Sequence, residues 1–437
     1  MADHMGLFDH ARTRGLRALR TNLGTACLLA SLGSFAIASY AGCSSSSSGS
    51  PSTADSGLPD SATIPSPDSG ADAVADSAAV DSSIETSADD SASPPADSTA
   101  PQEAATDTGA TVDCSNDDAG DGLPLDLQCT GLYSDWASKT VATANVYYKP
   151  AYVLWSDNAN KARYMYLPPG TKIDTTDMDN WVFPVGTKVW KEFALGPLRV
   201  ETRLLMKTAA GWIWTTYRWT ADGETGATQL NAGETNVNGT SYEIPAHSKC
   251  IQCHGGAGDM LMGFDVINLG SSASVGLPLS TLIAANQLTS NPPASVEIPE
   301  DSTGMARAPI GWLHSNCGVA CHNSNPNALA AGTGLYMKIS GAQIIAGGGA
   351  TTTSQLTTYV TAVNVVPNMQ PFASEGFLRI APGNPALSLI PTLDSARNNP
   401  NIPQMPPIIS HIADTADVTA LEAWISALPN PSDAGSD

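Results

Sequence analysis

Basic residues are scarce in this chain, and their scarcity limits its possible partners. The sequence has 20 Lys and Arg against 42 Asp and Glu, giving a formal net charge of −22 over 437 residues. Such a protein has little positive charge with which to neutralise nucleic-acid phosphates or to adsorb to anionic lipid. We therefore expect no nucleic-acid partner, and the natural electrostatic complement is a basic protein.

Familiar catalytic patterns are missing from residues 114–245. No paired carboxylates, Ser-His-Asp order or Gly-rich phosphate loop stands out there. Seven of the nine Trp lie in this segment. At alternating strand positions a Trp belongs more often to the core than to a polymer-binding platform. We therefore assign this segment no chemistry of its own.

Residues 44–113 contain no Lys, Arg or aromatic residue and consist mainly of Ser, Ala, Asp, Pro and Thr. Such a segment cannot bury enough apolar area to offset the entropy of ordering it. We expect an acidic disordered tether over residues 43–113. As a random coil, it would span roughly 50 Å.

The first 42 residues have the pattern of a signal peptide for a lipoprotein. Arg12, Arg14, Arg17 and Arg20 precede an apolar run, which ends at Ala41-Gly42-Cys43. Basic, apolar and small residues followed by a cysteine predict lipidation at Cys43. The alternative is an uncleaved N-terminal membrane anchor. Both place the rest of the chain in the bacterial cell envelope, on the outer membrane or the periplasmic face.

Two of the eight cysteines, Cys114 and Cys129, bracket a Gly/Asp-rich loop at the start of the expected folded region. In an oxidising compartment, this pair predicts a disulfide that fixes the N-terminal edge of the fold.

Residues 250–254 form a Cys-x-x-Cys-His motif, with Cys250, Cys253 and His254. Two thiols at this spacing and an adjacent imidazole are the attachment pattern for c-type haem. A thioredoxin-like redox pair or half of a zinc site also needs two thiolates two residues apart. The adjacent His, the predicted export signal and the absence of a second Cys-x-x-Cys pair favour haem, with His254 as an axial iron ligand.

A second motif places Cys317, Cys321 and His322 in the same order with one extra residue between the cysteines. A His-Ser pair precedes each motif at the same offset, at His247 and His314. We expect a second haem here, with His322 on its iron. A Cys317–Cys321 disulfide and a haem with a single thioether are the alternatives.

Strand patterns dominate residues 114–245. Residues 198–206 alternate between apolar and charged side chains, which predicts a strand with one buried and one wet face. A turn at 208–211 and the β-branched and aromatic run 212–219 complete a hairpin, and 147–155 and 185–193 are further candidates. We expect a β-rich domain, sandwich-like or barrel-like.

Helical patterns return from residue 306. Residues 307–313 should form a helix that leads into Cys317, with Pro309 near its start. Near the C-terminus, Asp414 is a predicted N-cap, and Val418, Leu421, Trp424, Ile425 and Leu428 mark one helical face. Two such helices crossing near a haem edge would close the core of a small cytochrome c.

Met405 is our candidate for the distal iron ligand of the second haem. It stands in the stretch Gln404-Met405-Pro406-Pro407, stiffened by two prolines, downstream of His322. A thioether opposite His raises a haem potential relative to His/His ligation. For the first haem the distal candidates are Met260, Met262, Met305 and His411, and the sequence does not choose among them.

With these residues identified, the chain resembles an uncharacterised family of bacterial dihaem c-type cytochromes, many of them lipoproteins. The resemblance runs from about Leu132 to Leu428. Its elements are 132–135, 183–187, 200–205, Ile244-Pro245, 313–317 and 404–407. The resemblance implies haem binding and electron transfer without an assigned substrate. The extra residue between Cys317 and Cys321 departs from the pattern.

The expected fold class is α+β, with a β-rich domain followed by a mainly α, cytochrome c-like haem region. The expected divisions are a signal peptide (1–42), a tether (43–113), a β-rich domain (114–245), a first haem segment (246–305), a cytochrome c-like domain (306–430) and a tail (431–437). The function expected is single-electron transfer through two covalent haems to a basic redox partner. The alternatives are a dihaem peroxidase-like enzyme and a surface-binding β-domain protein with accessory haem.

Overall fold

A computed structural model describes residues 112–430 of the chain. These residues belong to one compact unit. The predicted signal peptide, lipidated Cys43, tether and tail lie outside the described residues.

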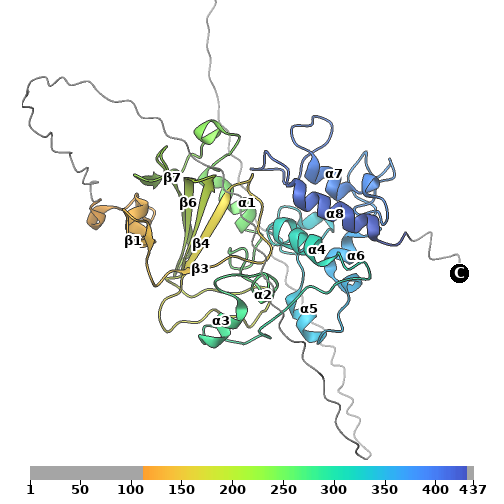
Figure 1. Cartoon of the computed structure of the whole chain (residues 1–437), viewed down its shortest axis with the longest axis horizontal. Coiled ribbons are helices and arrows are strands. Elements are labelled where there is room, and N and C mark those ends of the chain that lie inside the picture. Colours follow the sequence, from red (N-terminus) through yellow and green to blue (C-terminus); the bar gives the residue numbers. More distant parts are fainter. Residues whose placement is uncertain (1–111, 431–437) are drawn as a thin grey trace, which may run out of the picture. The chain divides into compact units, whose positions relative to one another are not determined.

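The centre of the described chain is a six-stranded antiparallel sheet (Figure 1). Each strand pairs with the next in the sequence, so the spatial order equals the chain order. The strands are β3 (Val146–Tyr147), β4 (Asn160–Tyr166), β5 (Lys188–Leu195), β6 (Leu198–Thr208), β7 (Gly211–Trp219) and β8 (Ala227–Gln229). The fold is thus mixed α+β, as predicted, because helices follow this sheet.

The predicted hairpin forms, with β6 paired to β7 from Glu201–Arg218 down to Thr208–Gly211. The expectation of one wet face is wrong. Leu204 is fully buried on one face of β6, but Glu201 is equally buried on the other. Both faces of the sheet are therefore covered.

The arrangement differs from the sandwich or barrel that the sequence suggested. Among residues 112–430 the remaining sheet is a single pair, β1 (Tyr133–Asp135) with β2 (Thr140–Val141). In the same range β3 and β8 do not pair, so the large sheet is open. A sandwich would need a second large sheet to cover the apolar face, and here irregular chain and helices cover it instead.

One face of the sheet is covered by the N-terminal part of the described chain. Leu123, Leu127 and Leu132 pack there against Trp190 and Trp219. The disulfide between Cys114 and Cys129, with a Cα–Cα distance of 5.3 Å, closes this segment as predicted.

The helices are short and follow the sheet. They are α1 (Cys250–His254), α2 (Val266–Gly270), α3 (Leu279–Ala284), α4 (Arg307–Leu313), α5 (Gly341–Ala346), α6 (Thr357–Ala362), α7 (Leu389–Ser395) and α8 (Thr415–Ala427). The two predicted helices are confirmed as α4 and α8. Asp414 caps α8 by accepting from the backbone N–H of Asp417 at 3.3 Å. Helix α8 lies against α4 (Figure 1), and Trp312 Nε1 donates to Asp414 at 3.2 Å.

The second face of the sheet shares one hydrophobic core with these helices. Val189 and Leu205 from the strands belong to the same buried cluster as Leu313, Leu421 and Trp424. The segments that we expected as a β-rich domain, a first haem segment and a cytochrome c-like domain are therefore packed around a common core.

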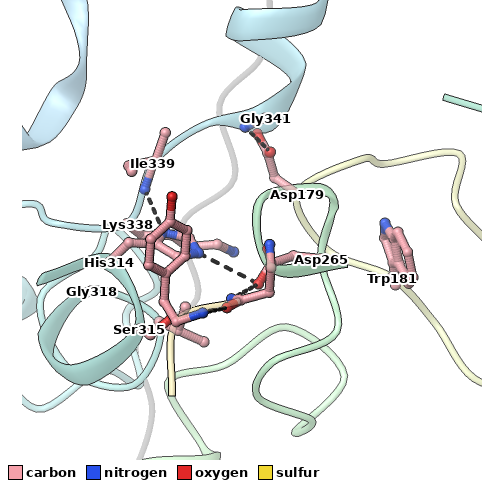
Figure 2. Close-up of polar contacts among 12 residues, drawn as sticks. Asp179, Trp181, Asp265, His314, Ser315, Gly318, Lys338, Ile339 and Gly341 are labelled. Carbon is pink, nitrogen blue, oxygen red and sulfur yellow. Dashed lines mark hydrogen bonds and ion pairs between the residues drawn. The ribbon is translucent and has the colours of Figure 1, made fainter. Parts of the chain in front are cut away.

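Polar contacts hold the same segments together (Figure 2). Asp179, in the loop before β5, accepts from the backbone N–H groups of Gly341 (2.6 Å) and Ala342 (3.2 Å) at the start of α5. The buried ring of His314 lies between Asp265 and the backbone N–H of Ile339. These contacts fix the ends of short helices that have little intrinsic stability.

Candidate functional site

The first Cys-x-x-Cys-His motif is a single helical turn. The chain reaches it in extended conformation through Ile244, then makes a 3₁₀ turn (His247–Lys249) and enters α1. In a helix, residues three and four apart share a face. Cys250, Cys253 and His254 therefore lie on one side of α1, as attachment to a single flat ligand requires.

The imidazole of His254 is held in one orientation. Its Nδ1 lies 2.6 Å from the carbonyl oxygen of Met260, which can only accept, so Nδ1 carries the proton. Nε2 then keeps its lone pair, the arrangement found in metal-bound histidines whose other nitrogen donates to a carbonyl. Burial lowers the pKa of His254 to about 4, against the opposing effect of the Met260 hydrogen bond. The ring is thus neutral, with the lone pair of Nε2 free.

The second motif has one extra residue between its cysteines, and the helix changes type just before it. After α4 the chain forms a π-helical turn, His314–Gly318. The π pattern of bonding continues into the motif, because the His322 N–H donates to the Cys317 carbonyl five residues earlier, at 2.8 Å. A π turn inserts one residue per turn of helix. The backbone thus accommodates the extra residue between Cys317 and Cys321, in a geometry that differs from the single turn of α1.

The Nδ1 atom of His322 is buried. It makes no hydrogen bond of good geometry with any described residue, although the Leu335 backbone interacts with the ring. Burial lowers the pKa of His322, and the Leu335 backbone partly opposes this, so the ring is neutral.

Two neighbouring cavities receive these side chains. The larger, of about 220 Å³, is lined by Cys250, Cys253, His254, Cys317 and Cys321. The smaller, of about 130 Å³, is lined by His322 together with Cys317 and Met405. Cys317, Asp394 and Met405 line both, so the two cavities share a wall.

The two motifs are in direct backbone contact. A Cβ on Gly256 would lie 1.8 Å from the carbonyl oxygen of Ala320, so only glycine fits there. The buried amide of Asn323 donates to the Gly256 carbonyl at 3.3 Å and to the Gly318 carbonyl at 2.7 Å. Segments more than 60 residues apart in the sequence thus form one site.

The four motif cysteines are free thiols, so the alternative disulfide between Cys317 and Cys321 is not formed. Burial raises the pKa of all four, that of Cys321 to about 11, where the nearby Cys253 adds to the effect. Over the described part of the chain, no group of three or more His, Cys, Asp and Glu side chains could hold a metal ion. Haem iron takes at most two protein ligands, so a haem site needs no such group.

The methionines considered as distal iron ligands differ in their surroundings and in whether they line a cavity. Met405 is half-buried, and Phe372, Leu389 and Leu393 pack around it. For the first site, Met262 lines the larger cavity, whereas Met260 and Met305 do not.

His411 is also outside the larger cavity lining, and its Nε2 lies 2.9 Å from Glu243. Met337 and Met369, which the sequence did not single out, line the smaller cavity. No local pattern marks them, because the loops that carry them reach the cavity only through the fold.

The two histidines that precede the motifs have different roles. His314 is buried and accepts from the Ile339 N–H at Nδ1 (2.9 Å), which leaves Nε2 to donate to Asp265 (3.4 Å; Figure 2). His247 is exposed and stacks on Trp214. Their equal offset therefore does not mark a shared function.

The strands form one wall of the larger cavity. The sequence patterns did not predict this wall. Arg163, Val189, Lys191, Arg203 and Leu205 line it from β4, β5 and β6. The sequence did contain one sign of this wall. Eight of the 20 Lys and Arg residues of this acidic chain fall between residues 161 and 207. A local excess of the scarce charge marks a functional surface more often than a uniform distribution does.

The chain matches no family model, no curated protein and no solved structure. None of the helices formed by residues 112–430 has both the length and the apolar character needed to span a bilayer.

Proposed function

We propose that this protein is a dihaem c-type cytochrome that transfers single electrons. Cys250 and Cys253 would hold the first haem with His254 on its iron, and Cys317 and Cys321 would hold the second with His322. The observation that carries the proposal is the convergence of both Cys/Cys/His sets on adjoining cavities. Bound haem would supply a reversible one-electron couple.

The residues present fit the group. Four free thiols line the cavities, and each set includes a neutral imidazole. His254 has its non-ligating nitrogen fixed by Met260. A thioredoxin-like pair would need one reactive, low-pKa thiol, whereas burial raises the pKa of Cys250 and Cys253 here.

The π-helical turn accommodates the extra residue of the second motif. Cys317 lines both cavities, whereas Cys321 lines the larger and His322 the smaller, so Cys321 would have to turn toward the smaller cavity for full attachment. Met405 is our proposed distal ligand of this haem, and α4 with α8 would form its cytochrome c-like enclosure. Met262 becomes the proposed distal ligand of the first haem because it lines that cavity.

The test is a count of covalent haem in the matured protein by the pyridine haemochrome assay. Wild type should carry two haems per chain. Cys250→Ser/Cys253→Ser and Cys317→Ser/Cys321→Ser should each carry one. Cys114→Ser/Cys129→Ser, which also removes two cysteines but lies outside both cavities, should keep two.

A count of zero in wild type would reject the proposal. A count of one that only Cys250→Ser/Cys253→Ser removes would show that the second motif is not used.

A peroxidase-like enzyme is the second candidate, and Asp394 favours it. This buried carboxyl lines both cavities, and its Oδ2 has no partner among the described residues. Such a group could exchange protons with a bound peroxide. Peroxide turnover that Asp394→Asn abolishes, with both haems retained, would favour the enzyme over the electron carrier.

We also propose lipid anchoring at Cys43 in the cell envelope and a basic redox partner. The acidic composition supports the partner's charge, because complementary potentials speed encounter. Release of Cys43→Ser from the membrane fraction would support the anchor.

A further inference from the structure

Three basic side chains stand in a row across the sheet wall of the larger cavity. Arg163 on β4 pairs directly with Lys191 on β5, and Lys191 pairs directly with Arg203 on β6. All three line the cavity. Like charges directly opposite each other on adjacent strands destabilise a sheet. This row, Arg163–Lys191–Arg203, therefore needs compensating negative charge.

The protein compensates only one end of the row. Arg203 makes a two-bond ion pair with the buried Glu201, at 2.8 and 2.6 Å. Arg163 is 5% exposed, yet its guanidinium has no hydrogen bond or ion pair with any described residue. Lys191 has no carboxylate partner either, and its Nζ lies over the ring of Phe193. Burial, together with the nearby Arg163, Lys161 and Arg203, holds the pKa of Lys191 well below its ordinary value.

The other carboxylates of the cavity do not balance these two charges. Asp157 accepts from the backbone N–H groups of His411 (2.8 Å) and Ile412 (3.1 Å), and Glu243 contacts His411. Asp414 caps α8. Asp394 has a side-chain oxygen without a hydrogen bond among the described residues. The cation that acts on this carboxyl is Arg397, which also donates to the Asp394 backbone carbonyl at 2.9 Å.

We propose that the Arg163–Lys191–Arg203 row binds the two propionate carboxylates of the haem attached at Cys250 and Cys253, an inference that rests on the proposed function. A buried guanidinium without a partner is matched by a carboxylate, which it can bind through two parallel hydrogen bonds. One propionate would pair with the Arg163 guanidinium, and the other would favour the protonated, cationic form of Lys191.

The row is beside the first motif rather than the second. Burial raises the pKa of Cys253, and the Arg203 and Lys191 charges partly oppose this. The same two cations contribute to the lowered pKa of His254. Arg163 and Lys191 are not among the residues that line the smaller cavity around His322.

The test measures the reduction potentials of both haems against pH in matured Arg163→Gln and Lys191→Gln. Lys188→Gln is the matched control, because Lys188 is on the same strand but points to the opposite face, where it bonds the Thr130 carbonyl. In wild type the paired propionates should stay ionised, so any change in the first haem's potential between about pH 5 and 7 should come from other groups. These are Asp394, whose pKa burial raises to about 7, and Lys161, whose pKa burial lowers to about 7.

Each row variant should shift the reduction equilibrium of the first haem about tenfold toward the oxidised form, or ~59 mV for one electron. The cause is the loss of a cation that favours the electron-rich state. The potential should also depend on pH more steeply than in wild type, because an unpaired propionate titrates nearer neutral pH. Lys188→Gln should behave as wild type, and Arg163→Lys should restore most of the shift.

Several outcomes would overturn the inference. Row variants with two haems and wild-type potentials would show that the propionates bind elsewhere. If added phosphate or nitrite shifts the wild-type potential and the row variants lose that response, the row binds a free oxyanion instead. Wild type without covalent haem would reject the proposed function itself. If Arg163→Gln does not fold, Lys191→Gln carries the same test.

Discussion

At the scale of single residues, the methionine at position 405 has the most consequential place. Its side chain lines both cavities, and its backbone N–H donates to the Leu393 carbonyl at 2.9 Å. Arg397 holds the Met405 carbonyl from the other side at 3.0 Å. The backbone around the thioether is thus fixed before any ligand binds, which lowers the entropic cost of using it as a weak iron ligand.

Replacing Met405 with Ala should change the second haem specifically. The sulfur-to-iron absorption near the red end of the oxidised spectrum should vanish, and the potential of that haem should fall, since water or a harder ligand replaces the thioether. The free energy of unfolding should drop by ~2 kcal/mol, the low end for a buried methionine, because Met405 is only half-buried. Optical spectra, redox titration and thermal unfolding measure the three effects.

Met369→Ala is the control, because Met369 lines the same smaller cavity. If its sulfur band disappears and that of Met405→Ala remains, Met369 is the ligand.

At the scale of elements, the helices depend on polar contacts at their ends more than on their own length. Helix α2 has five residues, too few to be stable alone. Asp265 caps it by accepting from the Asn268 backbone N–H at 2.8 Å and side chain at 2.9 Å. The same carboxylate accepts from His314, directly before the second motif (Figure 2).

This network predicts a loss of stability in acid. Burial alone would raise the pKa of Asp265. The His314 ring and the hydrogen bonds from His314 and Asn268 have a larger, opposite effect, and the net pKa is lowered to about 2. A carboxyl with a lowered folded-state pKa stabilises the protein above its ordinary pKa of about 4 and loses that effect as the pH falls toward 2.

The unfolding free energy of wild type should exceed that of Asp265→Asn by ~2 kcal/mol near neutral pH. The difference should shrink between about pH 4 and 2. Denaturant titrations at several pH values measure it. A difference that stays constant with pH would mean that the charge of Asp265 contributes nothing.

At the scale of the whole molecule, function depends on how closely two distant segments approach. Gly256, just after the first motif, contacts the Ala320 carbonyl within the second. Asn323 bridges the same two segments. This contact would bring the two haems of the proposed function close together, so that electrons pass between them within one chain.

Gly256→Ala should force these segments apart, because the added methyl group overlaps the Ala320 carbonyl. Overpacking of this kind costs about 1–3 kcal/mol. The variant should unfold at lower temperature and exchange electrons between its haems more slowly, as measured by calorimetry and by flash reduction. Gly332→Ala is the control, since a Cβ there meets nothing within 4 Å. Equal behaviour of the two variants would show that the close contact is unimportant.

Several features were predictable because their causes are local. The Cys/Cys/His spacing at 250–254, the capped helix from Thr415 to Ala427 and the Thr208–Gly211 hairpin each depend on neighbours within a few residues. The disulfide between Cys114 and Cys129 was predicted from the short loop between the two cysteines, on the expectation of an oxidising compartment. Periodicity and spacing report such short-range causes directly.

Other features were decided only when the chain folded. The alternation in β6 indicated that Arg203 and Leu204 point to opposite faces, but not that the Arg203 face would be covered. Strand pairing aligned Arg163, Lys191 and Arg203 from three separate segments. Packing placed Met405 and Met369 in the smaller cavity and Met305 outside both. A one-dimensional pattern records which residues share a face, whereas what covers that face depends on contacts between segments distant in the sequence.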